Sequence, residues 1–448
     1  MVKLPTTFVI IGATGDLAQK KLFPALFELY LENLLPKEWH IVAFSRRPWS
    51  DHDFRQFIRP LLDHTEEKKS LNSFLYHVFY HEGTFDDKES FERLFTRIQD
   101  TTKGRDKSRI VSFLSISPEF YSSVIAKKGA VHKALREQSH RSRLLVEKPF
   151  GHDLESARLL HILTEEFYEP NEIHLVDHYL GKPAFLRILD WRMCHSDAEM
   201  LFSKYYVESV NVKLHEEIDI TDRAAFYDKT GALRDVGQNH LLQMLAVALM
   251  NIPEDMTAKK MSAERKKVID DLVTPKGNTL RDVVVQGQYE GYKEQVKNLA
   301  STTETFFRIK TEVNSERWGG VPVTLEGGKA MSKQYVAVEI NFKEETAYGD
   351  SLIFEIQPDA GVYSKFKKDA ARKKIAEAEL KNSSLLHELP LQNAYGNIFL
   401  SSMRENAFLF PSVEEVMSAW RFVTPVIAMA RHIPLQVYKK GTLGPNSD

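Results

Sequence analysis

The stretch Thr7–Ala18, which reads TFVIIGATGDLA, constrains the fold of this chain more than any other stretch. A short apolar run leads into Gly12, Gly15 and Ala18, and a helical pattern follows over residues 19–33. A strand, a glycine turn and a helix in this order build a pocket for a pyrophosphate. Gly12 permits the tight turn, and Gly15 lets the backbone approach the phosphates because it has no Cβ. The N–H groups and the positive end of the helix then face the anion, which predicts a nucleotide site.

The length of the chain indicates how many domains it forms, and its charge argues against binding to nucleic acid or to an anionic membrane. A chain of 448 residues predicts two domains. The formal net charge of −2 gives no general attraction to nucleic acid or to an anionic membrane, and no apolar run has bilayer length. The basic stretch Lys365–Lys374 is interpreted as the solvated face of a helix.

Cysteine use and the start of the chain point to a compartment. The chain has a single cysteine, Cys194, which excludes an intrachain disulfide framework and a multi-cysteine metal site. A chain without disulfides is typical of a reducing compartment. The first strand begins within a few residues of Met1 and leaves no room for a signal peptide. We expect a cytoplasmic protein that needs no metal.

The first 177 residues alternate between strand-like and helix-like segments, which favours a parallel sheet covered by helices, an α/β Rossmann domain. The expected strands are Phe8–Ile11, His40–Phe44, Ile110–Ser115, Leu144–Val146 and Glu172–Val176. Helical patterns include Pro118–Gln138 and Leu154–Glu166.

Residues 178–448 predict an α+β domain with a large, mostly antiparallel sheet, because period-two segments follow one another without helices between most of them. The expected strands are Tyr205–Leu214, Val283–Gln288, Thr305–Lys310, Tyr335–Phe342 and Leu352–Ile356. The expected helices are Val236–Met250, Ala263–Leu272, Ser364–Leu380 and Val413–Ala430.

The end of the second strand indicates which dinucleotide binds. NAD sites usually carry a carboxylate here for the ribose hydroxyls, whereas this strand ends in Ser45-Arg46-Arg47. A guanidinium grips a phosphate through paired hydrogen bonds. The residues therefore favour NADP over NAD, with two exposed surface arginines as the alternative interpretation.

Three later segments carry candidate chemistry. Val146-Glu147-Lys148-Pro149 places a lysine after a strand at the cofactor edge of the sheet, on a bond that can be cis. Asp177-His178-Tyr179-Leu180-Gly181-Lys182 groups residues suited to a phosphoryl group. Arg234–His240 opens a helix, where His240 is a candidate general base because histidine is neutral near pH 7; a satisfied core histidine is the alternative.

Together these segments resemble glucose-6-phosphate dehydrogenases, as a short and somewhat divergent member. GATGDLA, EKPFG, DHYLGK and RDVGQNHLLQ occur in the family's order, and ERWGGVP, GGKA and IFEIQP follow. The resemblance implies oxidation of glucose 6-phosphate at C1 to the lactone, with NADP as hydride acceptor and NAD as the alternative. It also implies a homodimer or a dimer of dimers.

The resemblance also implies roles for residues. His240 would be the base, and Asp177 would hydrogen-bond it. Substrate residues would be Lys148, His178, Tyr179, Lys182, Glu216, Asp235, Lys329, Lys333 and Gln357. Cofactor residues would be Gly12, Ala13, Thr14, Gly15, Asp16, Leu17, Lys21, Arg46 and, again, Lys148.

Some positions depart from the family pattern. Pro183 stands where most members have Glu, and Arg192-Met193-Cys194-His195 replaces an Arg-Phe-Ala-Asn segment. Glu326 stands where an arginine usually precedes GGKA, and Lys333 is offset by one residue.

Two alternatives remain: an oxidoreductase of another sugar, similar to glucose–fructose oxidoreductase, and a paralogue that binds sugar phosphate or NADP without turnover.

Overall fold

The computed structural model describes residues 4–62, 68–102, 108–136, 141–221, 224–275, 280–369, 371–375, 389–404 and 408–445. The chain divides into two compact units. The first contains residues 1–151, 155–181 and 391–413, and the second contains residues 152–154, 182–390 and 414–448. The boundary expected after residue 177 lies close to this division, but a single cut cannot assign residues 391–413 to the first unit.

The first unit is built on a six-stranded parallel sheet in the order β3-β2-β1-β4-β5-β6. Its strands are β1 (Thr6–Ile11), β2 (Trp39–Ser45), β3 (Val78–Glu82), β4 (Arg109–Leu114), β5 (Arg141–Glu147) and β6 (Ile173–Val176). This is the strand order of dinucleotide-binding folds, in which ligands bind where the order reverses, between β1 and β4. The predicted Rossmann domain is confirmed.

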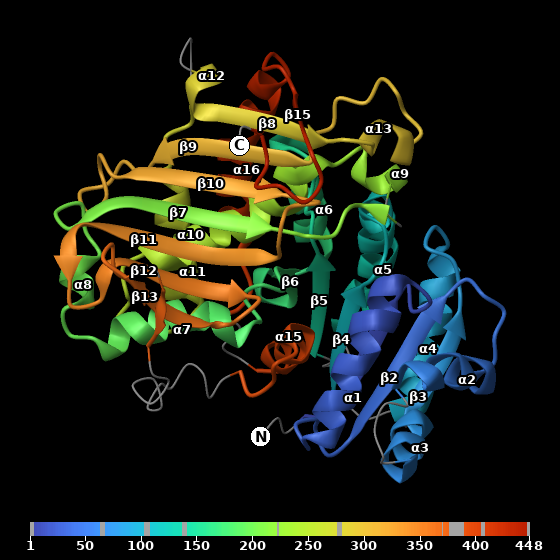
Figure 1. Ribbon diagram of the computed structural model, residues 1–448. Coiled ribbons are helices and arrows are strands. Elements are labelled where there is room, and N and C mark those ends of the chain that lie inside the picture. Colours follow the sequence, from blue (N-terminus) through green and yellow to red (C-terminus); the bar gives the residue numbers. More distant parts are fainter. Residues whose placement is uncertain are drawn as a thin grey trace. The chain divides into compact units, whose positions relative to one another are not determined.

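Helices accompany this sheet in Figure 1. They are η1 (Ala18–Leu22), α1 (Phe23–Leu31), α2 (Asp51–Leu62), α3 (Lys68–Tyr76), α4 (Lys88–Thr102), η2 (Pro118–Phe120), α5 (Tyr121–Arg136), α6 (Leu154–Phe167), η3 (Pro170–Glu172) and α15 (Ala394–Ser402). The helix α15 comes from late in the sequence and packs on α1. Its Phe399 lies against Phe8 of β1 and Phe113 of β4, at ring distances of 5.5 and 5.7 Å.

The second unit holds a nine-stranded sheet in the order β14-β13-β12-β11-β7-β10-β9-β8-β15. Its strands are β7 (Val207–His215), β8 (Val284–Tyr289), β9 (Phe306–Glu312), β10 (Pro322–Gly328), β11 (Tyr335–Thr346), β12 (Gly349–Gln357), β13 (Gly361–Lys365), β14 (Lys373–Lys374) and β15 (Gln436–Tyr438). Only the pairs β7–β10 and β8–β15 are parallel among those described. The predicted mostly antiparallel sheet is confirmed.

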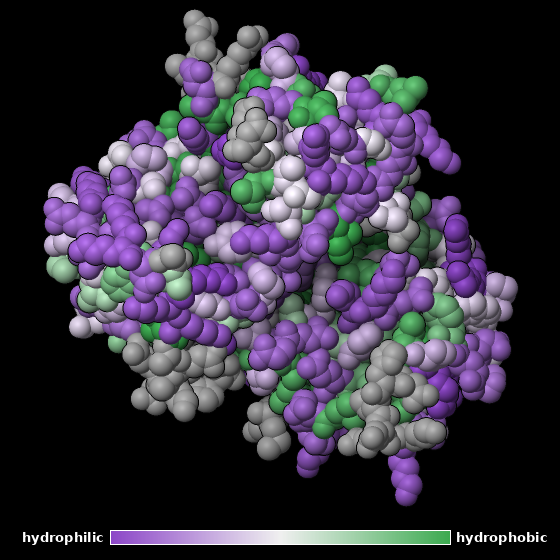
Figure 2. Space-filling view, in the orientation of Figure 1, coloured by the Kyte–Doolittle hydropathy of each residue, from purple (hydrophilic) through white to green (hydrophobic). Residues whose placement is uncertain are grey.

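The described helices of this unit leave one face of the sheet open. They are α7 (Pro183–Cys194), α8 (Ala198–Leu201), α9 (Ala224–Tyr227), η5 (Leu233–Leu241), α10 (Leu242–Leu249), α11 (Ala258–Asp270), α12 (Leu280–Val283), α13 (Tyr292–Gln295) and α16 (Val413–Ala430). η5 packs on β7 and β10, α10 on β11, and α7 on β12 and β13. The opposite face, nearest the viewer in Figure 1, is chiefly hydrophilic in Figure 2. Alternation along β7 explains this, because Val210, Val212 and Leu214 are fully buried while Asn211 and Lys213 are half-buried.

One expected helix is wrong. Residues 364–369 and 371–375 belong to β13, β14 and non-helical segments beside them. Residue 370 and the remainder of the expected helix Ser364–Leu380 lie outside the described residues. The basic stretch Lys365–Lys374 is therefore not a helix face. Pairing of β13 with β12 and with β14 overrides the helix propensity of the lysines in this stretch.

Candidate functional site

The glycine turn after β1 has the shape that a pyrophosphate site needs. Gly12 has a φ of +90°, and a Cβ there would lie 2.2 Å from the carbonyl oxygen of Ser115, so only glycine fits. The Gly15 N–H donates to the Gly12 carbonyl at 2.9 Å and closes the turn. The Thr14 and Ser45 hydroxyls lie 2.9 Å apart, which ties the turn to the end of β2. These features fit a dinucleotide.

The remaining residues of this turn differ in exposure. The side chain of Ala13 is buried, so it offers its backbone, and Leu17 is half-buried. Asp16 is exposed and forms an ion pair with Lys20 at 2.9 Å. Lys21 is exposed on η1.

The two arginines after β2 have different surroundings. The Arg47 guanidinium lies over the ring of Trp49 at 4.7 Å and near that of Phe57 at 5.9 Å. Arg46 is exposed and makes no ion pair with any residue that the structure describes. Both arginines are exposed, and the contact of the Arg47 guanidinium with aromatic rings is what distinguishes it from Arg46.

The strand β5 ends at a buried carboxylate beside Lys148. The Lys148–Pro149 peptide is cis, as the sequence suggested, and the Lys148 side chain is half-buried. Glu147 accepts hydrogen bonds from the Tyr395 hydroxyl at 2.6 Å and from the Lys148 N–H at 3.1 Å. Burial raises the pKa of the Glu147 carboxyl to about 7, although the hydrogen bond from Tyr395 and the charge of Lys148 oppose the rise.

The predicted phosphate loop follows β6. Asp177 is buried, and its carboxylate accepts from the Tyr179 N–H at 3.0 Å. The half-buried His178 ring stacks on Tyr395, with centroids 5.5 Å apart and planes 12° apart. Tyr179 is buried beside it, at a ring distance of 5.0 Å from His178. Sequence reasoning missed Glu147 and Tyr395; only the Glu-Lys-Pro turn carried a signal for Glu147.

In the second unit, His240 is buried in η5, which packs on β7 and β10. η5 has π-helical turns, a feature that occurs often at functional sites. The backbone N–H of His240 donates to Asn239 at 2.8 Å. The predicted hydrogen bond between Asp177 and His240 would join the two units, and it stays a prediction.

Three of the predicted sugar-binding residues meet in the second unit. The Lys329 ammonium, after β10, forms an ion pair with Glu216, after β7, and another with Asp235 of η5 at 3.4 Å. Lys329 is buried and lies 5.2 Å from the ring centre of Tyr227. The Lys329 ammonium can donate to the hydroxyl groups of a sugar, and the two carboxylates beside it can accept from them.

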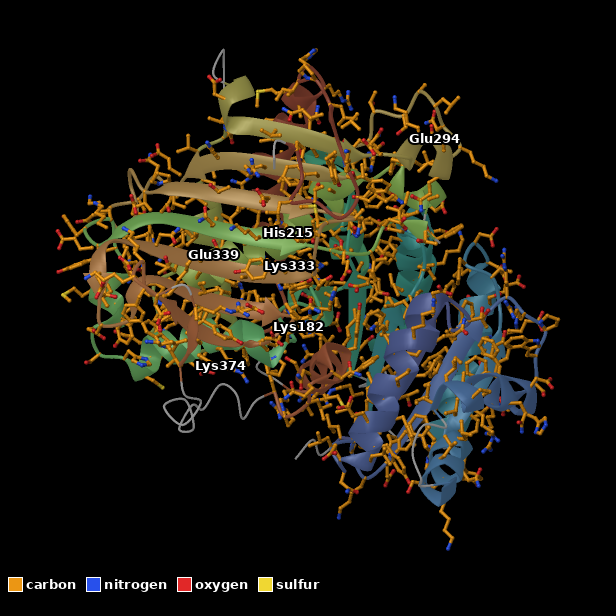
Figure 3. All side chains as sticks on the ribbon, viewed as in Figure 1. Lys182, His215, Glu294, Lys333, Glu339 and Lys374 are labelled. Atoms are coloured by element: carbon orange, nitrogen blue, oxygen red, sulfur yellow. The ribbon has the colours of Figure 1, made fainter. Side chains whose placement is uncertain are left out.

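The structure also brings Lys182 and Gln357 together but leaves Lys333 apart. The Lys182 ammonium donates to the Gln357 side chain at 2.7 Å. Lys333 is exposed, and its ammonium lies 5.0 Å from the ring centre of Tyr335 on the open face of the sheet, where Figure 3 labels it.

Glu326 stands where the family pattern has an arginine, and it has partners on both neighbouring strands. It accepts from His215 of β7 at 2.7 Å and forms an ion pair with Arg308 of β9. Burial alone would raise the pKa of Glu326, but the hydrogen bond from His215 and the charge of Arg308 lower it below its usual value. The inverted charge is thus compensated within the sheet.

Comparison with known proteins covers the whole chain. The family model for the NAD binding domain of glucose-6-phosphate dehydrogenase matches residues 9–185, and the model for its C-terminal domain matches residues 191–448. The glucose-6-phosphate 1-dehydrogenase of Borreliella burgdorferi is 32% identical, over 98% of this chain and 94% of the relative. That of Bacillus subtilis is 30% identical over the same shares.

Solved structures agree with the sequence comparison. A glucose-6-phosphate dehydrogenase in complex with glucose-6-phosphate has a TM-score of 0.86 and 28% identity, covering 99% of this chain and 96% of that one. A super-repressor mutant of Gal80p from Saccharomyces cerevisiae has a TM-score of 0.56 at 11% identity, over 96% of each chain, which shows a shared fold alone.

Proposed function

The chain belongs to the glucose-6-phosphate dehydrogenase family, and from this premise we propose that it oxidises glucose 6-phosphate at C1 to the 6-phosphogluconolactone with NADP. The observation that carries the proposal is that both family models match the chain, which also retains the candidate base, phosphate and sugar residues. NADP supplies the hydride acceptor when bound.

His240 is the base that takes the proton from the C1 hydroxyl as hydride leaves the same carbon. Its burial keeps bulk water from competing for that proton. Asp177 accepts from the His240 ring and stabilises the imidazolium that forms.

The sugar phosphate is held at both ends. The 6-phosphate is bound by His178, Tyr179 and Lys182. The sugar ring is bound or oriented by Lys329, Glu216, Asp235, Gln357 and Lys333. Lys148 lies between sugar and nicotinamide. The ion pairs at Lys329 support this assignment because they fix its ammonium in advance.

NADP is placed on the glycine turn. The backbone of Gly12–Leu17 and the exposed Lys21 face its phosphates, and Arg46 binds the 2′-phosphate. We assign nucleotide binding to residues 1–177 together with the late segment 391–413 that joins their unit, and substrate binding and dimerisation to the rest of residues 178–448.

The first test is the appearance of reduced nicotinamide when the purified protein meets glucose 6-phosphate and NADP, with NAD and unphosphorylated glucose in parallel. We expect turnover that is much faster with the phosphate ester than with unphosphorylated glucose and that prefers NADP. His240→Asn should retain sugar-phosphate binding and lose most turnover, on the order of 10²-fold or more. Wild-type turnover by that variant would refute the assigned base.

Lys329 and Lys333 make a matched comparison. Lys329→Met removes the ammonium that Glu216 and Asp235 share, so we expect a loss of kcat/KM on the order of 10²-fold. Lys333→Met removes an exposed ammonium and should cost less than about tenfold. Equal losses would contradict the distinction that exposure draws between them.

The proposed assembly is a homodimer or a dimer of dimers. The open, hydrophilic face of the nine-stranded sheet supports it, since it carries half-buried groups such as the ion pair at 2.9 Å between Lys213 and Glu339, the latter labelled in Figure 3. Light scattering of the purified chain tests it, and a monomer would refute it.

None of the described helices combines the length and apolar character that a membrane crossing requires. We also infer a cytoplasmic location, as named for the 31% identical Arabidopsis thaliana relative.

A further inference from the structure

A buried contact in the first unit joins two segments of the proposed site through a helix from late in the sequence. Tyr395 lies in the first turn of α15, whose N-cap Asn393 accepts from the Tyr395 N–H at 3.0 Å. The Tyr395 hydroxyl donates to Glu147 at 2.6 Å, and its ring stacks on His178. One side chain therefore contacts both the end of β5 and the phosphate loop.

A second contact from α15 fixes the other end of the phosphate loop. The Asn397 side-chain amide donates to the carbonyl of Gly181 at 2.9 Å, and Asn397 is fully buried. Gly181 itself has no room for a side chain, because a Cβ would lie 2.6 Å from the carbonyl oxygen of Ala394. The loop 177–181 is thus held at His178 and at Gly181 by one helix.

Glu147 holds Tyr395 in the orientation that the stacking requires. Rotation of the Tyr395 side chain would leave the buried carboxylate without this donor, which is costly away from water. The other Glu147 oxygen accepts from the Lys148 N–H, and the Glu147 carbonyl accepts from Tyr121 at 2.9 Å. The carboxylate therefore couples the ring orientation of Tyr395 to the backbone of Lys148.

We propose that Glu147 and Tyr395 are positioning residues, which hold the His178 ring in place for the phosphate of the substrate. This inference rests on the proposed function. Because His178 would contact the phosphate in both the ground state and the transition state, loss of its alignment raises KM and leaves kcat nearly unchanged. A substrate without phosphate gains nothing from the alignment.

The test compares two conservative tyrosine variants. Tyr395→Phe keeps the ring and removes the hydroxyl that meets the carboxylate, whereas Tyr121→Phe removes a buried hydroxyl that meets only the backbone of the same residue. We expect Tyr395→Phe to raise KM for glucose 6-phosphate about tenfold, which is about 1.4 kcal/mol. Its kcat, and its kcat/KM for unphosphorylated glucose, should change less than about twofold. Tyr121→Phe should leave all three unchanged.

A merely structural role predicts a different pattern. If Tyr395→Phe lowered kcat/KM equally for glucose and its phosphate, or left both unchanged, the proposal would be overturned. Glu147→Gln keeps the shape of the side chain and should raise KM for glucose 6-phosphate by a smaller factor. This variant replaces Tyr395→Phe in the test if Tyr395→Phe does not fold.

Binding measurements separate this inference from the proposed function. Calorimetry of glucose 6-phosphate binding to wild type, Tyr395→Phe and Tyr121→Phe needs no turnover. If wild type fails to oxidise the ester, the proposed function fails, yet a selective loss of binding in Tyr395→Phe would still support the positioning role. Equal binding by all three proteins would refute it.

Discussion

At the scale of single residues, the two arginines after β2 show why a motif needs its surroundings. The sequence offers both guanidiniums equally and both are exposed, but the Arg47 guanidinium lies over Trp49 and near Phe57. Aromatic contacts with a residue ten positions away cannot be derived from a dipeptide.

We therefore predict unequal effects on cofactor use. Arg46→Ala should raise KM for NADP by about 10- to 100-fold and leave KM for NAD nearly unchanged, because a hydrogen-bonded charge pair contributes about 1.5–3 kcal/mol. Arg47→Ala should lower the unfolding temperature through lost stacking and change KM for NADP less than about threefold. Steady-state kinetics with both cofactors decides, and a larger NADP effect in Arg47→Ala would contradict the assignment.

Glu147 predicts a pH dependence of stability. Its folded pKa of about 7 lies above the ordinary value of 4.5, so its contribution is fully present below pH 4.5 and is lost as pH rises through 7. The loss amounts to about 3 kcal/mol, because burial disfavours the charged form. Tyr121, Tyr395, Lys148 and Asp177 are the titratable groups around it.

Urea unfolding of wild type and Glu147→Gln measures this contribution. The glutamine does not titrate, so the free energy of unfolding of wild type should fall relative to that of the variant between about pH 5 and pH 8. Parallel curves for the two proteins would show that the carboxyl keeps an ordinary pKa in the folded state.

At the scale of elements, periodicity predicted ten of the described strands but missed five, β3, β10, β13, β14 and β15, and β3 and β10 show why. β3 (Val78–Glu82) is short and mixed in character, and β10 (Pro322–Gly328) begins with Pro and ends with two Gly residues, which indicate turns rather than strands. The conformation of these segments depends on the neighbouring strands β2, β7 and β9. Local patterns do not contain that information.

The same dependence explains how Glu326 is tolerated. Its carboxylate lies between His215 and Arg308 on the two strands beside β10, so the charge belongs to a local group of three. Restoring the arginine that is usual for the family would place it against Arg308 and His215 in a buried setting.

We predict that Glu326→Arg destabilises the protein by about 3–5 kcal/mol, because it removes one partner of a buried pair and adds a like charge. Glu326→Gln, which retains an acceptor for His215, should cost about 1–3 kcal/mol. Denaturant unfolding of both variants measures the difference. An arginine variant as stable as the glutamine one would mean that the three groups do not act together.

At the scale of the whole molecule, the chain does not divide at one point. Residues 391–413 return to the first unit after more than two hundred residues of the second. α15 buries Phe399 against β1 and β4, Tyr395 against Glu147, and Asn397 against Gly181. Sequence patterns place a boundary near residue 177 because the strand rhythm changes there, but they cannot show that a late helix completes an early sheet.

This arrangement predicts that the nucleotide-binding unit is incomplete without its late segment. Residues 1–181 alone expose the apolar surface that α15 covers, and loss of the Phe399 contacts by itself costs about 3–5 kcal/mol, a large part of the stability of a domain. The same fragment joined through a glycine-serine linker to residues 391–413 should unfold cooperatively and bind NADP. The fragment without the segment should bind the dye ANS and unfold without a sharp transition. If both fragments unfolded with the same midpoint, α15 would contribute nothing to the fold of the first unit, and its contacts with the phosphate loop would be the only reason for its place there.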